Sequence, residues 1–450
     1  MFWETIKNYI EKSFGLDKLD TPLGIITCVF MCINVLLVIL MFYRSIYLII
    51  GCFFKVKPYK EAPKDKKYAF IISARNEEKV IGNLIDSIKS QDYPAELIRI
   101  YLIADNCSPE DKTSAIAKEK GAIVYERHDL SMKRKGYALK LLFENIARDY
   151  GIESVDGYIL MDADNIISHD FVSKMNDAFC NGKGDVYTGH IVSKNFTENF
   201  FAYAHSIDVM RSNLSEQAPR QILHTGTLTR GTGVLFKSSL FANGWKWLTI
   251  AEDKEFSIDF IDNGGKIEYV KDAVFFDEQP YSLKISLRQR LRWAKGGLIL
   301  FAKYGHKIIW SFLKKPSWYK YDTYFTVLPS SLITFALGFI YNVTCLCLGL
   351  TGSPGYSLDS FLLYLANISL SIMAGGLLTA IIVAIKEKKN IPCPWYKELV
   401  FLIIFGFYDL LFVPISFVAL FTNVTWKHID HKNKTSMKEM EDMLAKKNQK

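Results

Sequence analysis

Residues 157–164, Gly-Tyr-Ile-Leu-Met-Asp-Ala-Asp, decide the fold class of this chain. The first five form a short apolar run, which is typical of a strand buried on both faces of a sheet. The run ends in two carboxylates, Asp162 and Asp164, one residue apart. A buried strand that stops at acidic side chains presents them at the edge of its sheet.

Two stretches nearer the N-terminus repeat this pattern. The apolar run 68–73 leads into Arg75-Asn-Glu77, and the run 98–104 leads into Asp105-Asn-Cys. Residues 122–125 predict a further strand, and apolar spacing predicts helices over 78–91, 109–120 and 136–147. Alternating strands and helices predict an α/β fold, a mostly parallel sheet with helices on both faces. Ligands of such sheets bind at the carboxyl ends of the strands, where the three polar clusters should meet.

Long apolar runs flank this domain on both sides. One covers residues 23–54, and three more cover about 324–350, 360–385 and 398–422. Each is long enough to cross a hydrocarbon core of about 30 Å. We therefore expect a transmembrane anchor at 23–54, a cytosolic domain at 56–282 and a membrane domain of about three transmembrane helices at 324–422.

Composition and charge agree with a membrane protein. Half of the 450 residues are hydrophobic, and 55 Lys and Arg against 47 Asp and Glu leave a net charge of +8. This apolar content excludes global disorder. The basic residues cluster beside the apolar runs, which is typical of cytoplasmic flanks rather than of a nucleic-acid binder. We expect a multi-pass protein of the cell membrane, with the lipid bilayer as a partner and no nucleic acid.

The two ends of the chain are polar. Residues 1–22 form an amphipathic segment, and residues 423–450 form a Lys-rich tail in which we expect His428 and His431 to be solvated. Three C-terminal spans would place this tail outside, whereas its Lys content is typical of the cytoplasm. Either the charge rule is broken, or one apolar segment is re-entrant or interfacial. Asp409, in the last run, either contacts a substrate or pairs with Tyr408 or a neighbouring helix.

The carboxylates at the strand ends suit phosphate chemistry. Two neighbouring carboxylates, Asp162 and Asp164, could share Mg²⁺ or Mn²⁺, and such an ion stabilises a departing diphosphate. Asp105 could accept hydrogen bonds from a base or ribose, or could be a helix cap. Lys135, at a helix start, could hold phosphate or could be a solvated charge.

Later motifs suit binding and proton transfer. Gly231-Thr232-Gly233 could let a substrate approach the backbone closely or could form a turn. Glu252 and Asp253 could take a proton from a hydroxyl or could mark a helix N-terminus.

The stretch 283–315 is basic and amphipathic, which predicts interfacial helices. Within it, Gln289, Arg292 and Trp293 share one helical face. Arg292 can bind a diphosphate, and Trp293 can stack on a sugar ring.

In combination these residues resemble the membrane-embedded, processive members of family 2 glycosyltransferases, such as cellulose, chitin, hyaluronan and poly-N-acetylglucosamine synthases. The resemblance covers about 68–300 and implies a Rossmann-like GT-A domain. This chain has Ala251 before Glu252-Asp253, where the family usually has Thr. It also has one N-terminal span, where several relatives have two. Three C-terminal spans are few for a polymer channel, so a homodimer or a secretion partner would complete a pore.

The resemblance implies inverting, metal-dependent transfer from a UDP-sugar, UDP-GlcNAc or UDP-glucose, to a growing polysaccharide at the cytoplasmic face. The alternative is transfer of one sugar to a polyprenyl-phosphate or glycolipid acceptor; the Gln289-Arg-Leu-Arg-Trp293 element favours a polymer. A non-catalytic scaffold would lack Asp164, Asp253 or Arg292, which are all present. The implied roles are nucleotide-sugar binding by Glu77, Asp105, Lys135, Asp162 and Arg292; metal binding by Asp164 and Asp162; catalysis by Asp253 with Glu252; and acceptor binding by Gln289, Trp293, Gly231, Thr232 and Gly233.

Overall fold

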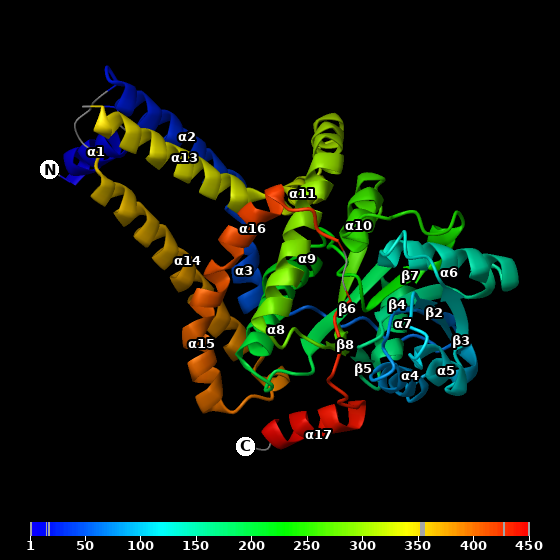
Figure 1. Ribbon diagram of the computed structural model, residues 1–450. Helices are drawn as coiled ribbons and strands as arrows, with labels where there is room; N and C mark the ends of the chain where they lie inside the picture. Colours follow the sequence, from blue (N-terminus) through cyan, green and yellow to red (C-terminus); the bar gives the residue numbers. More distant parts are fainter. Residues whose placement is uncertain (1, 15, 17–18, 352–355, 426–427, 449–450) are drawn as a thin grey trace.

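The computed structural model describes residues 2–14, 16, 19–351, 356–425 and 428–448. Figure 1 shows a sheet domain on one side and a group of long helices on the other, with the N-terminus at the far end of those helices. The C-terminal helix α17 (Met437–Asn448) lies instead against the sheet-domain side.

An eight-stranded sheet forms the centre of the domain, in the order β3-β2-β1-β4-β7-β6-β8-β5. Strands β3, β2, β1 and β4 pair in parallel, as do β6 and β8, whereas β7 is antiparallel to β4 and β6, and β5 to β8. The predicted mostly parallel α/β fold is confirmed. The strands are β1 (Tyr68–Ala74), β2 (Ile98–Asp105), β3 (Ile123–Arg127), β4 (Gly157–Asp162), β5 (Ile166–Ile167), β6 (Val186–Ser193), β7 (Val234–Lys237) and β8 (Ile267–Asp277).

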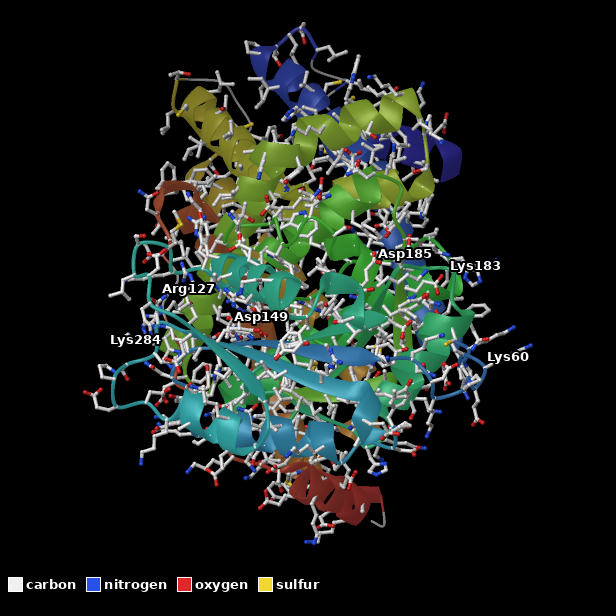
Figure 2. All side chains as sticks on the ribbon, turned by 90° about the vertical axis from the view of Figure 1, so that its right-hand side faces the viewer. Lys60, Arg127, Asp149, Lys183, Asp185 and Lys284 are labelled. Carbon is white, nitrogen blue, oxygen red and sulfur yellow. The ribbon has the colours of Figure 1, made fainter. Side chains whose placement is uncertain are left out.

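Helices cover both faces of the sheet because successive strand residues point to opposite sides. In β1, Phe70 and Ile72 join one apolar core, and Ala69 and Ile71 join the other. The first core is closed by α4 (Ile81–Lys89), α5 (Thr113–Glu119) and α7 (Phe171–Asn181), and the second by α6 (Lys135–Asp149) and α10 (Glu252–Asp262). Figure 2 shows charged side chains around this domain, with Lys60 and Lys183 at one edge and Arg127 near the other.

A third core joins the sheet domain to the remaining helices. It contains side chains of β6, of α8 (Phe200–Ser212), of the C-terminal half of the chain and of α17. Asn199 begins α8, since its side-chain oxygen accepts hydrogen bonds from the amides of Phe201 and Ala202. A π-helical turn (Asn213–Gln217) and α9 (Ala218–Ile222) continue α8.

Four helical stretches have the length and composition of a membrane span: Pro22–Phe53, Ser330–Leu350, Leu358–Lys386 and Trp395–Phe421. One precedes the sheet domain and three follow it, as the sequence predicts. The helices are α1 (Phe2–Ser13), α2 (Pro22–Met41), α3 (Tyr43–Phe53), α11 (Leu283–Lys314), α12 (Trp318–Val327), α13 (Ser330–Leu350), α14 (Leu358–Lys386), α15 (Trp395–Leu410) and α16 (Phe412–Phe421). Pro414 explains the break between α15 and α16, because it cannot donate a hydrogen bond to the carbonyl of Leu410.

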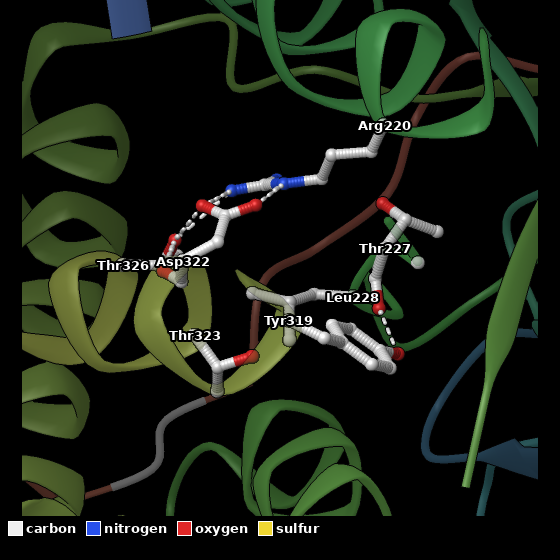
Figure 3. A pocket seen from close by; sticks show the side chains of 8 residues that line it. Arg220, Thr227, Leu228, Tyr319, Asp322, Thr323 and Thr326 are labelled. Carbon is white, nitrogen blue, oxygen red and sulfur yellow. Dashed lines mark hydrogen bonds and ion pairs between the residues drawn. The ribbon is translucent and has the colours of Figure 1, made fainter. Parts of the chain in front are cut away.

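A buried ion pair fastens the N-terminal anchor to the sheet domain (Figure 3). Arg220 on α9 donates to both carboxylate oxygens of Asp322 on α12, at 2.7 and 2.9 Å. The hydroxyls of Tyr43 and Tyr47 on α3 donate to the same carboxylate, each at 3.0 Å. Arg220 and Asp322 are 4% and 2% exposed, so the charges are compensated within the protein rather than by water.

Candidate active site

The strand ends meet as the sequence predicts. Ser73 of β1 is paired with Asp162 of β4, and Ala74 is paired with Ala104 of β2, so the three polar clusters leave the sheet at one edge. Asn76 and Asn106 adopt φ of 55° and 54°, which turn the chain sharply after β1 and β2. Parallel pairing therefore gathers the predicted residues into one region.

Lys135 links the aspartate pair to the glycine-rich loop. Its ammonium forms an ion pair with Asp162 and donates to the carbonyl of Gly231 at 2.7 Å. The amide of Asp162 donates to the hydroxyl of Thr232 at 3.0 Å. The nearby carboxylates outweigh burial, which alone would lower the pKa of Lys135, and raise that pKa above its ordinary value. Lys135 is therefore a fixed cation between β4 and the loop.

The predicted base lies beside the same loop. Glu252 and Asp253 begin α10, and a Cβ added to Gly231 would lie 3.4 Å from Asp253 Oδ2. Gly231 has φ of +80°, and Gly233, with φ of +64°, leaves no room for a Cβ against the ring of Phe275. Burial, and then the charge of Asp253, raise the pKa of Glu252 to about 7. The glycines thus leave room beside the partly exposed Asp253, whose neighbour Glu252 is buried.

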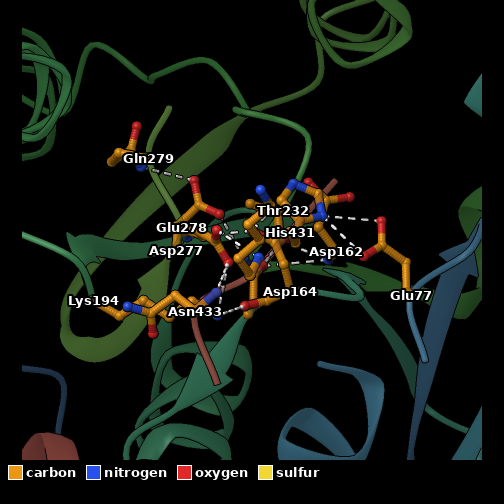
Figure 4. Close-up of polar contacts among 12 residues, drawn as sticks. Glu77, Asp162, Asp164, Lys194, Thr232, Asp277, Glu278, Gln279, His431 and Asn433 are labelled. Atoms are coloured by element: carbon orange, nitrogen blue, oxygen red, sulfur yellow. Dashed lines mark hydrogen bonds and ion pairs between the residues drawn. The ribbon is translucent and has the colours of Figure 1, made fainter. Parts of the chain in front are cut away.

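Asp164 lies in a deeper acidic cluster (Figure 4). It is 5% exposed, and its Oδ2 accepts a hydrogen bond from the amide of Glu278 at 3.2 Å. Burial opposes ionisation, but His431 and Lys194 lower the pKa of Asp164 below its ordinary value. Burial and the adjacent charge of Asp164 raise the pKa of Asp277 well above its ordinary value. The surroundings therefore shift the pKa values of these two neighbouring carboxyls in opposite directions.

His431 belongs to this cluster, so the expectation of a solvated side chain is wrong. His431 Nδ1 lies 2.9 Å from Glu77 Oε2, and its Nε2 lies 3.9 Å from Asp164 Oδ2. The two carboxylates outweigh burial and raise the pKa of His431 to about 10, while burial raises the pKa of Glu77 to about 7. The amides of Lys432 and Asn433 donate to the Glu278 carboxylate at 3.0 and 3.1 Å.

Sequence reasoning also missed Lys194, Asp277 and Glu278. The polar run Asp277-Glu278-Gln279 begins at the last residue of β8, so it repeats the pattern of the three recognised strand ends. That signal was available from the sequence. No strand-end pattern or periodicity places His431 beside Glu77, because 354 residues separate the two.

Asp105 is buried at the end of β2. Its Oδ1 accepts hydrogen bonds from Arg127 at 2.6 Å and from Asn106 at 2.9 Å. Burial raises the pKa of Asp105, although Arg127 opposes this rise. Both bonds use the same carboxylate oxygen. The arrangement fixes the orientation of Asp105 at the predicted nucleotide side of the site.

The predicted face of α11 lies beside α8. Trp293 is 37% exposed, and its ring contacts that of His205 edge-on at 5.7 Å. The charge of Arg292 lowers the pKa of Glu252, against the larger effect of burial. Gln289 has a buried Oε1 that accepts no hydrogen bond from the described residues. The helix therefore connects the Glu252 region to an aromatic surface next to the membrane helices.

Oxygen ligands in this region fit a hard divalent cation. Asp162, which is ion-paired with Lys135, and the buried Asp164 provide carboxylates at the end of one strand. Within the described residues, no group of three or more His, Cys, Asp or Glu side chains has the arrangement of a metal site. Mg²⁺ is commonly held by one or two carboxylates together with substrate phosphates, so two protein ligands suffice.

This sheet, with its carboxylate-bearing edge, is the GT-A fold of glycosyltransferases. Mannosyltransferase PcManGT from Pyrobaculum calidifontis, solved in complex with GDP-Man and Mn2+, shares that fold with a TM-score of 0.54. The two are 15% identical, over 81% of this chain and 98% of the mannosyltransferase. The sequence matches the family described as "Glycosyltransferase like family 2" over residues 63–296. The chain belongs to this family and is an enzyme of the glycosyltransferase class.

Curated relatives fall within the same class. The N-acetylglucosaminyltransferase of Rhizobium meliloti (strain 1021) is 25% identical over 242 residues, which are 50% of this chain and 54% of the relative. The hyaluronan synthase of Streptococcus pyogenes is 25% identical over 286 residues, 57% of this chain and 63% of the synthase. The chain thus matches little more than half the length of these relatives.

Proposed function

We propose that this protein transfers a sugar from UDP-GlcNAc or UDP-glucose to a growing polysaccharide at the cytoplasmic face of the membrane, with inversion at the anomeric carbon. The observation that best supports this proposal is that Lys135 joins the end of β4 to the glycine-rich loop. One ammonium bonds both Asp162 and the Gly231 carbonyl, which brings the aspartate pair next to the loop that contacts Asp253. A donor diphosphate and an acceptor hydroxyl therefore have binding groups on neighbouring walls.

Asp253 is the proposed general base. It accepts the proton of the acceptor hydroxyl as that oxygen attacks the anomeric carbon. The bond between this carbon and the diphosphate breaks on the opposite face, and its electron pair leaves with UDP. Arg292 and Lys135 offset the charge that develops on the diphosphate, which is often a large contribution to catalysis. The buried side chain of Glu252 precedes Asp253 at the start of α10, and we assign it an assisting role in catalysis.

Asp164 and Asp162 would hold Mg²⁺ or Mn²⁺. When bound, such an ion neutralises the charge of the departing diphosphate. The carboxylate of Asp164 is ionised and buried, which suits a ligand. The mannosyltransferase with the same fold was solved with Mn2+, which supports metal use without identifying the metal here.

Asp105 and Glu77 are proposed to bind the uridine, because they lie at the ends of β2 and β1, and β1 pairs with both β2 and β4. Gln289 and Trp293 are proposed to hold the acceptor, together with Gly231, Thr232 and Gly233. The partly exposed ring of Trp293 suits a sugar face. Similarity to hyaluronan synthase favours a polysaccharide over a single-sugar lipid product.

The test is UDP release by the full chain in lipid vesicles, across a panel of UDP-sugars with Mn²⁺ or Mg²⁺. Product size is measured in the same reaction. We expect release with one donor and a product of high mass. A lipid carrying one sugar would establish the alternative acceptor, and no release with any donor would contradict the proposed donor class.

Asp253→Asn tests the base, and Asp272→Asn, an exposed carboxylate in the same domain, is its matched control. We expect Asp253→Asn to lower turnover at least 10²-fold and to keep UDP binding, since base catalysis contributes about 10²–10⁴-fold. Asp272→Asn should resemble the wild type. Equal turnover in both variants would remove Asp253 from the mechanism.

A further inference from the structure

Trp395–Phe421 has the length and composition of a span, yet one face of it follows the sheet domain along its length. Phe401 packs against Tyr203, with ring centroids 5.1 Å apart. At the middle of the stretch, the Tyr408 hydroxyl lies 2.8 Å from that of Ser286 on α11. These contacts begin near the start of the helix and continue past its centre.

Charged groups extend this contact. Asp409 forms an ion pair with Arg211 of α8 at 3.1 Å, so this mid-helix carboxylate pairs with a neighbouring helix. Arg211 also forms an ion pair with Asp208, and Asp208 binds Arg290 of α11 at 3.2 Å. Placing such a group of charges in hydrocarbon requires much more free energy than placing it beside a polar domain. Asp409 therefore faces the sheet domain and not the lipid.

The far end of the helix also stays at this surface. The carbonyl of Ala419 accepts a hydrogen bond from Lys295 of α11 at 3.1 Å. From Phe401 to Ala419 a helix rises about 27 Å, close to the full hydrocarbon thickness of about 30 Å. A helix that crossed the bilayer would leave the domain over that distance. Figure 1 shows α16 beside α11, and α15 next to the end of α14.

The opposite face of the same helix is apolar and open. Val400, Phe407 and Val418 are 52%, 59% and 50% exposed, and they fall within about 20° of one another around the helix. This face continues the apolar surface of α14, against which α15 packs. It fits the acyl chains of a single leaflet.

The tail gives an independent constraint. Ten residues after Phe421, His431 contacts Glu77 at the strand ends. Ten residues span at most about 35 Å, so a start on the far side would require non-helical chain to cross the hydrocarbon core. Such a segment would leave backbone polar groups without partners in lipid.

We propose that Trp395–Phe421 does not cross the bilayer but lies along the leaflet nearest the catalytic domain, with its apolar face against the lipid chains. The described chain then crosses three times, at Pro22–Phe53, Ser330–Leu350 and Leu358–Lys386. The end of α14 lies at the domain, where Glu387 is 3.7 Å from His190. The tail and the catalytic domain share one side, which agrees with the Lys content of the tail.

The first test counts labels on single molecules in sealed vesicles. A membrane-impermeant maleimide is applied from outside, and intact mass gives the number of labels. The exposed cysteines are Cys32, Cys180 and Cys347. Cys32 and Cys347 are replaced by Ser, which leaves Cys180 of the catalytic domain exposed, and Lys446→Cys adds a second exposed cysteine in α17. We expect molecules with none or two labels, whatever the vesicle orientation. Tyr9→Cys, in the exposed face of α1, should give one label with Cys180. One label per molecule for Lys446→Cys would overturn the proposal.

The second test measures depth along the helix. Nitroxides are attached singly at Val400→Cys, Phe407→Cys and Val418→Cys in a chain whose native cysteines are replaced. A flat helix gives the three sites similar depths. A crossing helix places Phe407 about 10 Å deeper than Val400 and puts Val418 near the opposite surface. That depth pattern would refute the proposal, and maleimide labelling remains available if the replaced chain does not fold.

Discussion

Replacing Asp322 by Ala removes the carboxylate that holds Arg220 and the two tyrosines of the anchor. Arg220 is 4% exposed and would keep its charge in a place where water does not compensate it. Breaking a buried ion pair in this way costs about 3–5 kcal/mol. We expect the midpoint of thermal unfolding in detergent to fall by roughly 5–10 °C.

An exposed pair of the same length is the matched control. Lys237 Nζ lies 2.7 Å from Asp185 Oδ1, the same distance that separates Arg220 Nε from Asp322 Oδ2. The side chains of Lys237 and Asp185, however, are 37% and 47% exposed. Asp185→Ala should therefore cost no more than about 1 kcal/mol. The double variant Arg220→Met with Asp322→Leu should recover most of the loss, because apolar groups often replace a buried pair without cost.

The comparison separates burial from distance as the source of the effect. If Asp322→Ala were no less stable than Asp185→Ala, burial would not determine how much the Arg220–Asp322 pair contributes to the free energy of unfolding. If the double variant were as unstable as Asp322→Ala, the loss would come from the tyrosine contacts or from packing. Either result would refute the reasoning from uncompensated charge.

Three further outcomes are expected. Because the pKa of Glu252 is raised from 4.5 to about 7, its ionisation destabilises the fold as the pH rises through that window. In thermal melts, the stability of Glu252→Gln relative to the wild type should therefore increase from pH 5 to pH 8, by up to about 3 kcal/mol. An equal difference in stability at both pH values would contradict the shifted pKa. Gly231→Ala should lower kcat/KM at least tenfold, because its Cβ would lie 3.4 Å from Asp253 Oδ2 and occupy space proposed for the acceptor; Gly151→Ala, with the same φ of +80° and no neighbour within 4 Å, should leave activity intact. A chelator should reduce UDP release more than tenfold, with recovery on adding Mn²⁺ or Mg²⁺ to the wild type and none for Asp164→Asn; unchanged release would exclude a metal role.

Local patterns in the sequence predict much of this fold. The apolar runs before Glu77, Asp105 and Asp162 are the strands β1, β2 and β4, because burial on both faces requires such runs. Parallel pairing then brings their ends together, so the region of the site follows from topology. The four apolar helices follow from length and hydropathy.

Contacts between distant parts of the chain could not be predicted in the same way. His431 and Asp409 find partners 354 and 198 residues away, and no periodicity encodes such pairs. Composition described the surroundings of His431 as a solvated Lys-rich tail, but packing of Met440 in the third core holds that tail against the domain. Hydropathy alone likewise does not distinguish a crossing helix from one with an apolar outer face and a polar partner.

The contact between His431 and Glu77 also sets an order of events during synthesis. Ribosomes add about 5–20 residues per second, so the 354 residues between these side chains take roughly 20–70 s to make. Throughout this interval the sheet and its carboxylates can fold, but the acidic cluster lacks its imidazolium. A nascent chain made up to α14 therefore carries an incomplete form of the proposed donor site. The site gains its last cation only after the three crossing segments have left the ribosome, so assembly in the membrane precedes completion of the site.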